Sequence, residues 1–350
     1  MRIIGCDLHA SQQSIAMLDD ETGENTQATL KHEGETVRQF YAALPRPVIV
    51  GIEATGSMGW FLTLLEDLGI PCHVGHPATI RAAEPRRQKH DRRDAVLLRD
   101  LLVEHRFPSI WQPSTELRDL RALLLHRHEW VRMRTRVRNA LQSIALAHGV
   151  RRHASLWSRT GQATLSALPL APHAADRRAA LQTLHGALHR HIQELDQRVS
   201  TQAHARAQAC RLMTHPGVGP VTALATEVFV GDPTRFRDGK ALASYVGMIP
   251  SEYSSGPRQR LGRLTKQGNR FLRFLWCEAG QQAARYEVGL RRFYRRKLQQ
   301  KGVGKARVAV GRKLGIRLWI LLRDQIDYAE FCRRAPSRTN GVVKPVCGNA

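Results

Sequence analysis

An apolar run at 48–52 that ends on the carboxylate of Glu53 restricts the fold of the first part of the chain. A continuous apolar run of this kind is typical of a parallel strand buried on both faces, with the carboxylate at its C-terminal edge. Three strand-like stretches precede it, at 3–8, 14–18 and 26–31, and short turns join them. These stretches predict three successive antiparallel strands.

Helix-like stretches at 37–44, at 60–68 and from 79 onward alternate with this strand and with another at 71–74. Three hairpin strands followed by alternating helices and strands is the order of a ribonuclease-H-like α/β domain. Periodicity alone does not separate that fold from other mixed α/β folds.

From residue 116 the pattern becomes helical. Apolar residues recur at spacings of three and four over 117–144 and again over 181–199, with prolines marking the break between them. The two narrow stripes favour a helical coiled-coil region, either an antiparallel pair or a dimerising arm, with packing inside one subunit as the plain alternative. We place domains at 1–112, 113–210 and 211–332, the last mainly α-helical, and a disordered tail at 333–350.

The charge is concentrated in one part of the chain. The 350 residues hold 54 Lys and Arg against 30 Asp and Glu, a formal charge of +24. Residues 1–60 have a net charge of −4, whereas residues 256–317 have eighteen basic and two acidic side chains, a net of +16. A concentrated basic segment, with aromatic residues interleaved, indicates contact with phosphates and stacking on unpaired bases, and a solvated helix face is the alternative.

Composition excludes several other classes of protein. No apolar run approaches the roughly 18 to 20 residues that a membrane-spanning helix needs, and no signal sequence follows Met1, so we expect a cytoplasmic protein without a membrane partner. The six cysteines lie far apart without a CxxC pair, which predicts reduced thiols and neither a zinc site nor a disulfide framework.

Four carboxylates are candidates for a metal site. Asp7 lies on the first predicted strand and Glu53 ends the fourth, while Asp91 and Asp94 are three apart at the start of a predicted helix and so share one face. Hard oxygen ligands favour Mg²⁺ or Mn²⁺. Taken singly, each acid has an ordinary explanation as a strand end, a turn cap or a helix N-terminal charge. Three further residues border the predicted site: His9, Thr55 and His90.

The basic part of the chain holds the second set of candidates. Ser255 lies beside Gly256, where a turn can expose its hydroxyl group as a nucleophile. Gly217 and Gly219, in a Gly-x-Gly turn between two predicted helices, resemble a helix-hairpin-helix device that binds phosphate through backbone N–H groups. The predicted nucleic-acid-binding side chains are Arg258, Arg260, Arg263, Lys266, Arg270 and Arg273.

Five separated motifs together resemble a known family. They are Gly5-Cys6-Asp7, Gly51-Ile52-Glu53-Ala54-Thr55-Gly56, Asp91-Arg92-Arg93-Asp94-Ala95, His215-Pro216-Gly217-Val218-Gly219-Pro220, and Ser254-Ser255-Gly256 followed by Gly262 and Lys266-x-Gly268-Asn269. Their order over residues 3–275 is similar to that of DEDD-type insertion-sequence transposases, also described as bridge-RNA-guided recombinases. The resemblance implies an N-terminal RuvC-like domain, a coiled-coil connection and a C-terminal transposase domain.

The resemblance also implies roles for individual residues. Asp7, Glu53, Asp91 and Asp94 would be the DEDD carboxylates that bind Mg²⁺, and Ser255 would form a covalent phosphoserine link with cleaved DNA. The working site would be assembled in a homo-oligomer, a dimer or a tetramer. A noncoding bridge RNA would pair with donor (element-end) and target DNA while the protein holds the backbones. His90 departs from the threonine that the family commonly has, and Ser254 stays an alternative to Ser255.

The sequence therefore predicts a transposase that excises and inserts a mobile DNA element by metal-assisted, serine-dependent strand exchange. Two alternatives stay open. A RuvC-like junction resolvase or nuclease would use the acids alone, with the serine as a turn residue. A noncatalytic nucleic-acid-binding scaffold would use neither the acids nor the serine for chemistry.

Overall fold

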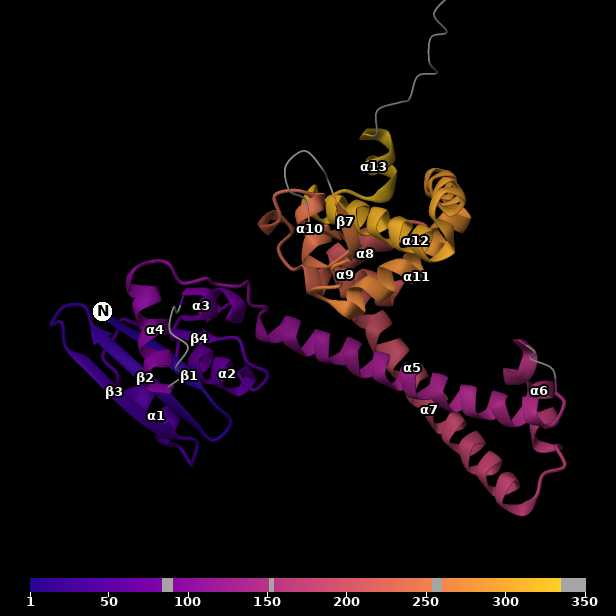
Figure 1. Ribbon diagram of the computed structural model, residues 1–350, viewed down its shortest axis with the longest axis horizontal. Coiled ribbons are helices and arrows are strands. Elements are labelled where there is room, and N and C mark those ends of the chain that lie inside the picture. The colour runs from indigo at the N-terminus through magenta and orange to yellow at the C-terminus, as the bar shows by residue number, and fades with distance from the viewer. Residues whose placement is uncertain (84–90, 151–153, 254–259, 335–350) are drawn as a thin grey trace, which may run out of the picture. The chain divides into compact units, whose positions relative to one another are not determined.

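The protein divides into two compact units, residues 1–115 and residues 116–350 (Figure 1). The computed structural model describes residues 1–83, 91–150, 154–253 and 260–334. The predicted tail at 333–350 lies, from residue 335 on, outside the described residues. Among the described helices, none is both long and apolar enough to cross a membrane.

The first unit is built on a five-stranded mixed sheet in the order β3-β2-β1-β4-β5. β1 pairs antiparallel with β2 and parallel with β4, so the central strand joins a hairpin half to a parallel half. The strands are β1 Arg2–Leu8, β2 Gln12–Asp19, β3 Asn25–Lys31, β4 Val48–Glu53 and β5 Cys72–Gly75. The predicted mixed α/β character is confirmed, and each predicted strand lies within about two residues of its expected ends.

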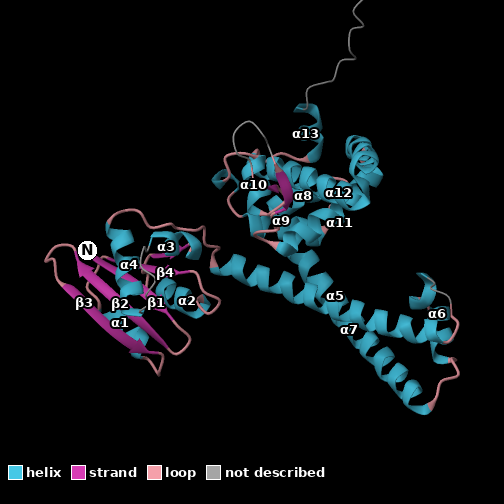
Figure 2. Ribbon diagram, viewed as in Figure 1, coloured by secondary structure: helices cyan, strands magenta, loops and turns pink. Residues whose placement is uncertain are grey.

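Helices cover both faces of this sheet (Figure 2). On one face, Cys6 and Ile52 pack in a core with Tyr41 and Phe61 from the first two helices. The opposite face is covered by α4, which approaches β1 most closely. The helices of this unit are α1 Thr36–Ala43, α2 Gly59–Asp67, α3 Pro77–Ala83 and α4 Asp91–Val103.

The second unit begins with two long helices, α5 Thr115–Ala147 and α7 Pro172–His204. Arg127 of α5 is paired with Asp196 of α7, and Arg138 donates a hydrogen bond to His185, so the helices run antiparallel. This confirms an antiparallel pair within one chain. The pair is joined by η1 Ala154–Trp157 and α6 Arg159–Ser166. A second copy is not needed to cover the apolar stripe at Leu141 and Leu188, although a further role in dimerisation stays a prediction.

The remaining elements form a mostly helical body around α9, whose residues 222–230 are all buried. Trp276 lies at its centre and donates a hydrogen bond of 2.9 Å to Thr226 Oγ1. Leu124 of α5 and Val199 of α7 belong to the same core, so the ends of the long helices are anchored here, and the predicted boundary near residue 210 stays a prediction. The elements are α8 Ala207–Met213, α9 Pro220–Val230, η2 Pro233–Arg235, α10 Gly239–Tyr245, β6 Pro250–Glu252, β7 Leu261–Leu264, α11 Arg270–Tyr286, α12 Val288–Arg323 and α13 Tyr328–Arg334.

Candidate active site and nucleic-acid interface

Two of the predicted acids end neighbouring parallel strands. Cys6 of β1 lies opposite Ile52 of β4, and Asp7 and Glu53 are the residues that follow this pair. Because side chains alternate between the faces of a sheet, both carboxylates project from the same face, at the carboxyl edge of the two strands. The register therefore puts these two acids at the same edge and on the same face of the sheet.

The face that carries the acids is the face that α4 covers. A Cβ atom at Gly5 would lie 2.0 Å from the carbonyl oxygen of Ala95 and 2.3 Å from the backbone nitrogen of Arg99. Only a residue without a side chain admits the helix backbone at this distance. Gly5 is two residues before Asp7 and shares its face, so α4 lies directly beside the strand that carries the first acid.

The direction of α4 places its first turn toward Asp7. Arg99, one turn after Ala95, donates a 2.7 Å hydrogen bond to the side chain of Asn25, which lies level with Ile3 across the sheet. Later turns of α4 therefore lie toward the amino end of β1. The first turn, which carries the partly buried Asp94, lies toward the carboxyl end (Figure 1). Asp91 is the first residue of the same helix, and its side chain lies outside the described part of the structure.

A histidine contacts the first acid directly. His9 Nε2 lies 3.1 Å from Asp7 Oδ2, with the carboxylate side chain 13% exposed and the imidazole 40% exposed. This contact fixes one carboxylate oxygen and presents the imidazole to solvent. Of the other two bordering residues, Thr55 Oγ1 lies 3.3 Å from Ser57 Oγ, and His90 lies outside the described residues.

The donor set of the acidic site consists of carboxylate oxygens. Among the side chains that the structure describes, a set that leaves out Asp91, no three of His, Cys, Asp and Glu lie close enough to hold a metal ion. The fold thus places Asp7 and Glu53 at one edge of the sheet and the first turn of α4, with Asp94, on the same side of it, but these described side chains do not form a three-ligand cluster. Hard oxygen donors of this kind suit Mg²⁺ or Mn²⁺.

The predicted nucleophile lies in the sequence between two paired strands of the second unit. β6 and β7 pair antiparallel, and the Tyr253 N–H donates to the carbonyl oxygen of Arg260 at 2.9 Å, which closes the described end of the hairpin. Residues 254–259 join the two strands, so Ser254, Ser255 and Arg258 fall outside the described residues. The structure therefore fixes the base of this segment.

The predicted basic side chains divide into two groups. Exposed side chains are found at Arg260, Arg263, Lys266 and Arg270. Arg273 is different because its Nη1 donates to the carbonyl oxygens of Val246 and Gln267, at 2.7 and 2.6 Å, and burial lowers its pKa. The guanidinium of Arg273 thus holds two backbone segments together, whereas the other four side chains are exposed to solvent.

The Gly-x-Gly turn lies between α8 and α9, as expected. Gly217 has φ +83°, and a Cβ there would lie 2.4 Å from the backbone nitrogen of Ala283, so this glycine lets the turn pack on α11. A Cβ at Gly219 would meet nothing within 4 Å, which leaves the start of α9 accessible. His215 is 1% exposed, and burial lowers its pKa to about 4, so it adds no positive charge at neutral pH. Phosphate binding at this turn stays a prediction.

The sequence did not predict the structural roles of the glycines and of Asn269 in these motifs, which are close packing and helix capping. Gly51 also lies two residues before an acid, and a Cβ there would lie 2.7 Å from Leu102 of α4. In the Lys266-x-Gly268-Asn269 motif, a Cβ at Gly268 would lie 1.9 Å from the carbonyl oxygen of Tyr245, and Asn269 caps α11 by accepting a hydrogen bond from Leu272 N. The repeated Gly-x-acid spacing was the signal in the sequence that could have identified the close approach of α4.

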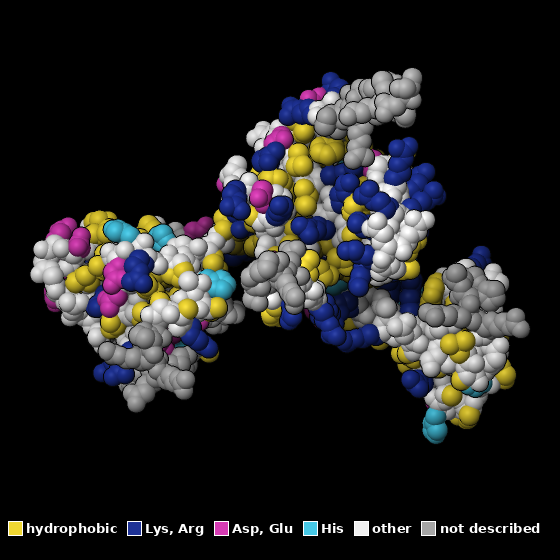
Figure 3. Space-filling model, turned by 45° about the horizontal axis from the view of Figure 1, so that its top comes forward, with side chains coloured by type: hydrophobic (Ala, Val, Ile, Leu, Met, Phe, Trp, Pro, Cys, Tyr) yellow, Lys and Arg dark blue, Asp and Glu magenta, His cyan; other side chains and the backbone are white. Residues whose placement is uncertain are grey.

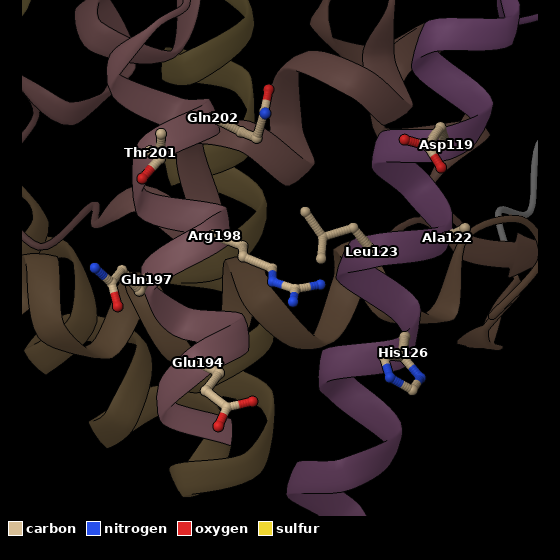
Figure 4. Close-up of a pocket in the computed structure, with 9 residues that line it drawn as sticks. All are labelled: Asp119, Ala122, Leu123, His126, Glu194, Gln197, Arg198, Thr201 and Gln202. Carbon is tan, nitrogen blue, oxygen red and sulfur yellow. The ribbon is translucent and has the colours of Figure 1, made fainter. Parts of the chain in front are cut away.

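A separate open groove of about 940 Å³ lies between α5 and α7. In Figure 4, Arg198 of α7 extends toward α5, while Glu194 lies one turn below it. None of the predicted catalytic or nucleic-acid-binding residues lines this groove. The groove is lined by Asp119, Ala122, Leu123, His126, Glu194, Gln197, Arg198, Thr201 and Gln202.

Comparison with known proteins agrees with this arrangement. Residues 4–148 match the family model of DEDD transposases of the IS110 type, and residues 209–295 match the model described as the transposase IS116/IS110/IS902 family. The first match contains the acids, and the second contains the hairpin and the basic side chains. The chain belongs to the IS110/IS116/IS902 family of transposases.

Relatives from two bacteria support the family assignment. The chain is 28% identical over 306 residues to a probable family 20 transposase of Pseudomonas aeruginosa, covering 83% of this chain and 88% of that protein. It is 25% identical over 293 residues to the transposase for insertion sequence element IS1111A of Coxiella burnetii, covering 80% and 79%. An enzyme of this family acts on DNA, in transposition or recombination.

Proposed function

We propose that this transposase excises and inserts its element by metal-assisted, serine-dependent strand exchange that a noncoding RNA guides. The observation that supports the proposal is the position of Asp7 and Glu53 at one edge of the sheet, with the backbone of α4 packed against the same face. The strand order β3-β2-β1-β4-β5 supports a ribonuclease-H-like, RuvC-like domain.

The four acids Asp7, Glu53, Asp91 and Asp94 would hold Mg²⁺ or Mn²⁺. A bound divalent ion would supply charge stabilisation to a phosphodiester undergoing transfer. His9 orients one oxygen of Asp7, so it acts as a positioning residue in this proposal. Two carboxylates on one face repel each other unless a cation lies between them, which favours binding of an ion at this edge.

The serine step is a transesterification. The Ser255 hydroxyl oxygen attacks a backbone phosphorus, its proton leaves, and one strand end departs as a free hydroxyl while a phosphoserine ester forms. The hydroxyl of a second strand then attacks the same phosphorus and releases Ser255. Each step breaks one phosphoester bond and forms another, so the number of phosphoester bonds is unchanged and the exchange needs no external energy source. Exposed arginines at the hairpin base, Arg260 and Arg263, would neutralise charge on the phosphate.

The acids and the serine lie in different units, so the working site must unite parts of one chain or of two. Assembly in a dimer or tetramer is one way to achieve this. RNA guidance rests on the family resemblance and on the strong positive charge of the second unit. Base pairing would select donor and target DNA, while the protein holds the backbones.

A recombination assay tests the proposal. The full-length protein is supplied with element ends, target DNA, the cognate RNA and Mg²⁺, and joined product is quantified. Asp7→Asn and Ser255→Ala should each lower product by about 10²-fold or more, because each removes a group that the chemistry requires. Ser254→Ala is the matched control and should retain product.

A covalent protein–DNA adduct on nicked substrate separates the rival functions. The proposal expects an adduct from the parent protein and none from Ser255→Ala. Cleavage that persists in Ser255→Ala without any adduct would indicate a resolvase or nuclease. Metal-independent binding with no cleavage would indicate a scaffold, and normal product from a protein carrying both Asp7→Ala and Ser255→Ala would refute the assignment.

A further inference from the structure

α12 is a helical hairpin with its bend at a glycine. Gly302 has φ +74°, a left-handed conformation that interrupts the helix between residues 288–301 and 303–323. Glu287 is paired with Arg317 at 3.0 Å, and the Phe293 ring lies 4.5 Å from Lys313 Nζ. Because both contacts join residues at similar distances before and after Gly302, the two arms lie against each other.

The two arms of α12 differ in burial. The arm at 303–323 packs on α11, where a Cβ at Gly311 would lie 2.9 Å from the Cα of Cys277. The arm at 288–301, which we call the outer arm, has one fully buried side chain, Leu290, among its described residues. The outer arm thus lies on the surface of the second unit, and the buried arm at 303–323 connects it to α11.

The hairpin is strongly basic. Its 36 residues include twelve Lys or Arg and no Asp or Glu. Three of the arginines are engaged within the fold: Arg317 pairs with Glu287, Arg323 pairs with Asp324, and Arg291 donates to backbone carbonyls. The exposed basic side chains are Arg292, Arg295 and Arg296 on the outer arm, and Lys301, Lys305 and Arg307 near the bend.

The exposed arginines of the outer arm form one row. Arg292, Arg295 and Arg296 are spaced three and four residues apart, so they share a helix face. Figure 3 shows Lys and Arg side chains gathered on the part of the second unit that contains this helix. Helix positions of this kind place several cations at fixed spacing, as repeated contact with a polyanion requires.

The aromatic residues of the outer arm are partly buried in the fold. Phe293 and Tyr294 are partly buried against the core of the second unit. Arg296 and Lys297 also lie over the Phe293 ring, at 5.7 and 5.8 Å from its centre. The Phe293 ring therefore contacts the cations of both arms of α12, and the exposed side chains of the outer arm that carry charge are the three arginines and Lys301.

We propose that the outer arm and the bend of α12 bind the phosphate backbone of a nucleic-acid duplex without reading its sequence. The proposal takes the class of partner from the proposed function; its surface lies within the basic segment 256–317 but outside the acids, the serine and the individual basic residues named there. The second family match ends at residue 295, within the outer arm. The surface would hold the flank of a substrate whose reacting phosphate lies at another site.

The first test removes the positive charges of the three exposed arginines of the outer arm. Binding of the full-length protein to a 25-base-pair duplex of arbitrary sequence is measured from about 50 to 300 mM salt, for a DNA duplex and for an RNA duplex. The triple variant Arg292→Gln, Arg295→Gln, Arg296→Gln should bind about 10- to 100-fold more weakly at 0.15 M salt. Its slope of log affinity against log salt should fall by about two to three, as expected for three lost phosphate contacts.

A matched triple variant on another surface controls for net charge. Arg159→Gln, Arg177→Gln and Arg190→Gln remove the same charge from exposed positions of α6 and α7. This variant should retain the parent salt slope. Equal loss in both triple variants, or an unchanged slope in the α12 variant, would overturn the proposal. A loss confined to DNA or to RNA identifies which backbone is the natural ligand and supports the proposal.

The second test concerns the bend. A Cβ at Gly302 or at Gly304 would meet nothing within 4 Å, but only Gly302 has a positive φ. Gly302→Ala therefore strains the backbone alone and should disturb the hairpin, weakening duplex binding at least about 3-fold, whereas Gly304→Ala should not. Equal affinities for the two variants would contradict a role for the bend.

These binding measurements are independent of strand exchange. Ser255→Ala should abolish exchange and leave the duplex affinity and its salt slope unchanged. If Ser255→Ala remains fully active, the proposed function fails while the α12 result stands. If the α12 variants bind as the parent does, the α12 proposal fails while the proposed function stands.

Discussion

At the scale of single residues, the acidic site depends as much on glycine as on carboxylate. Gly5 lets α4 lie against β1, and Gly51 faces the same helix two residues before Glu53. Without these glycines, a helix that carries Asp94 could not reach the face on which Asp7 projects. The spacing Gly-x-acid in both strands thus couples the packing of the domain to the placement of its candidate metal ligands.

Gly5→Ala should therefore damage both stability and activity. The new Cβ would overlap the backbone of α4, so the helix must move, at a cost of about 1 to 3 kcal/mol or more. Urea denaturation followed by circular dichroism measures the loss. Gly59→Ala is the control, because a Cβ there meets nothing within 4 Å and α2 gains a better helix former. Equal stability of the two variants would show that the close approach is wrong.

At the scale of elements, the motifs of the second unit hold helix ends in place. Gly268 packs against Tyr245, Asn269 caps α11, and the Arg273 guanidinium ties the same turns through two carbonyl oxygens. These contacts fix the base of the hairpin on which Ser255 is carried. A motif residue here can thus be required without touching nucleic acid.

Substitutions at Asn269 distinguish its role as the N-cap of α11 from a role in binding phosphate. Asn269→Ala should lower stability by about 1 kcal/mol, whereas Asn269→Asp should retain it, because aspartate is an equally good N-cap. Both variants should keep the parent affinity for a DNA duplex. Urea denaturation and fluorescence anisotropy measure the two effects, and a selective loss of binding in Asn269→Asp would instead place Asn269 against a phosphate.

At the scale of the whole molecule, charge follows the division into units. Residues 1–115 hold twelve basic and fifteen acidic side chains, a net charge of −3, while residues 116–350 have a net charge of +27. Each of the described hydrophobic core clusters lies within one unit, and none of them includes residues from both. We therefore expect one unit to supply the carboxylates of the site and the other to supply the electrostatic attraction for nucleic acid.

Separate fragments should show this division. Residues 116–350 should bind a DNA duplex with nearly the salt slope of the full chain, and residues 1–115 should bind at least about 10-fold more weakly, because phosphate contacts come from cations. Both fragments should give the circular dichroism of folded protein, since each has a core of its own. Salt-dependent binding that resides in residues 1–115 would contradict this account.

The sequence by itself predicted the strands of the first unit and the two long helices of the second, because strand and helix periodicities are local: the apolar run at 48–52 suits a buried strand, and the apolar stripe at 181–199 suits one face of a helix. It also predicted the acids at Asp7 and Glu53, since parallel strands end at a common edge. Only the tertiary structure decided which segments meet. In it, α4 packs against Gly5, and the Arg273 guanidinium donates to backbone carbonyls. The bend of α12 at Gly302 brings Lys313 over the Phe293 ring. Such contacts join residues that are distant in the chain, and a composition rich in arginine does not distinguish a side chain that holds the fold from one that faces a phosphate.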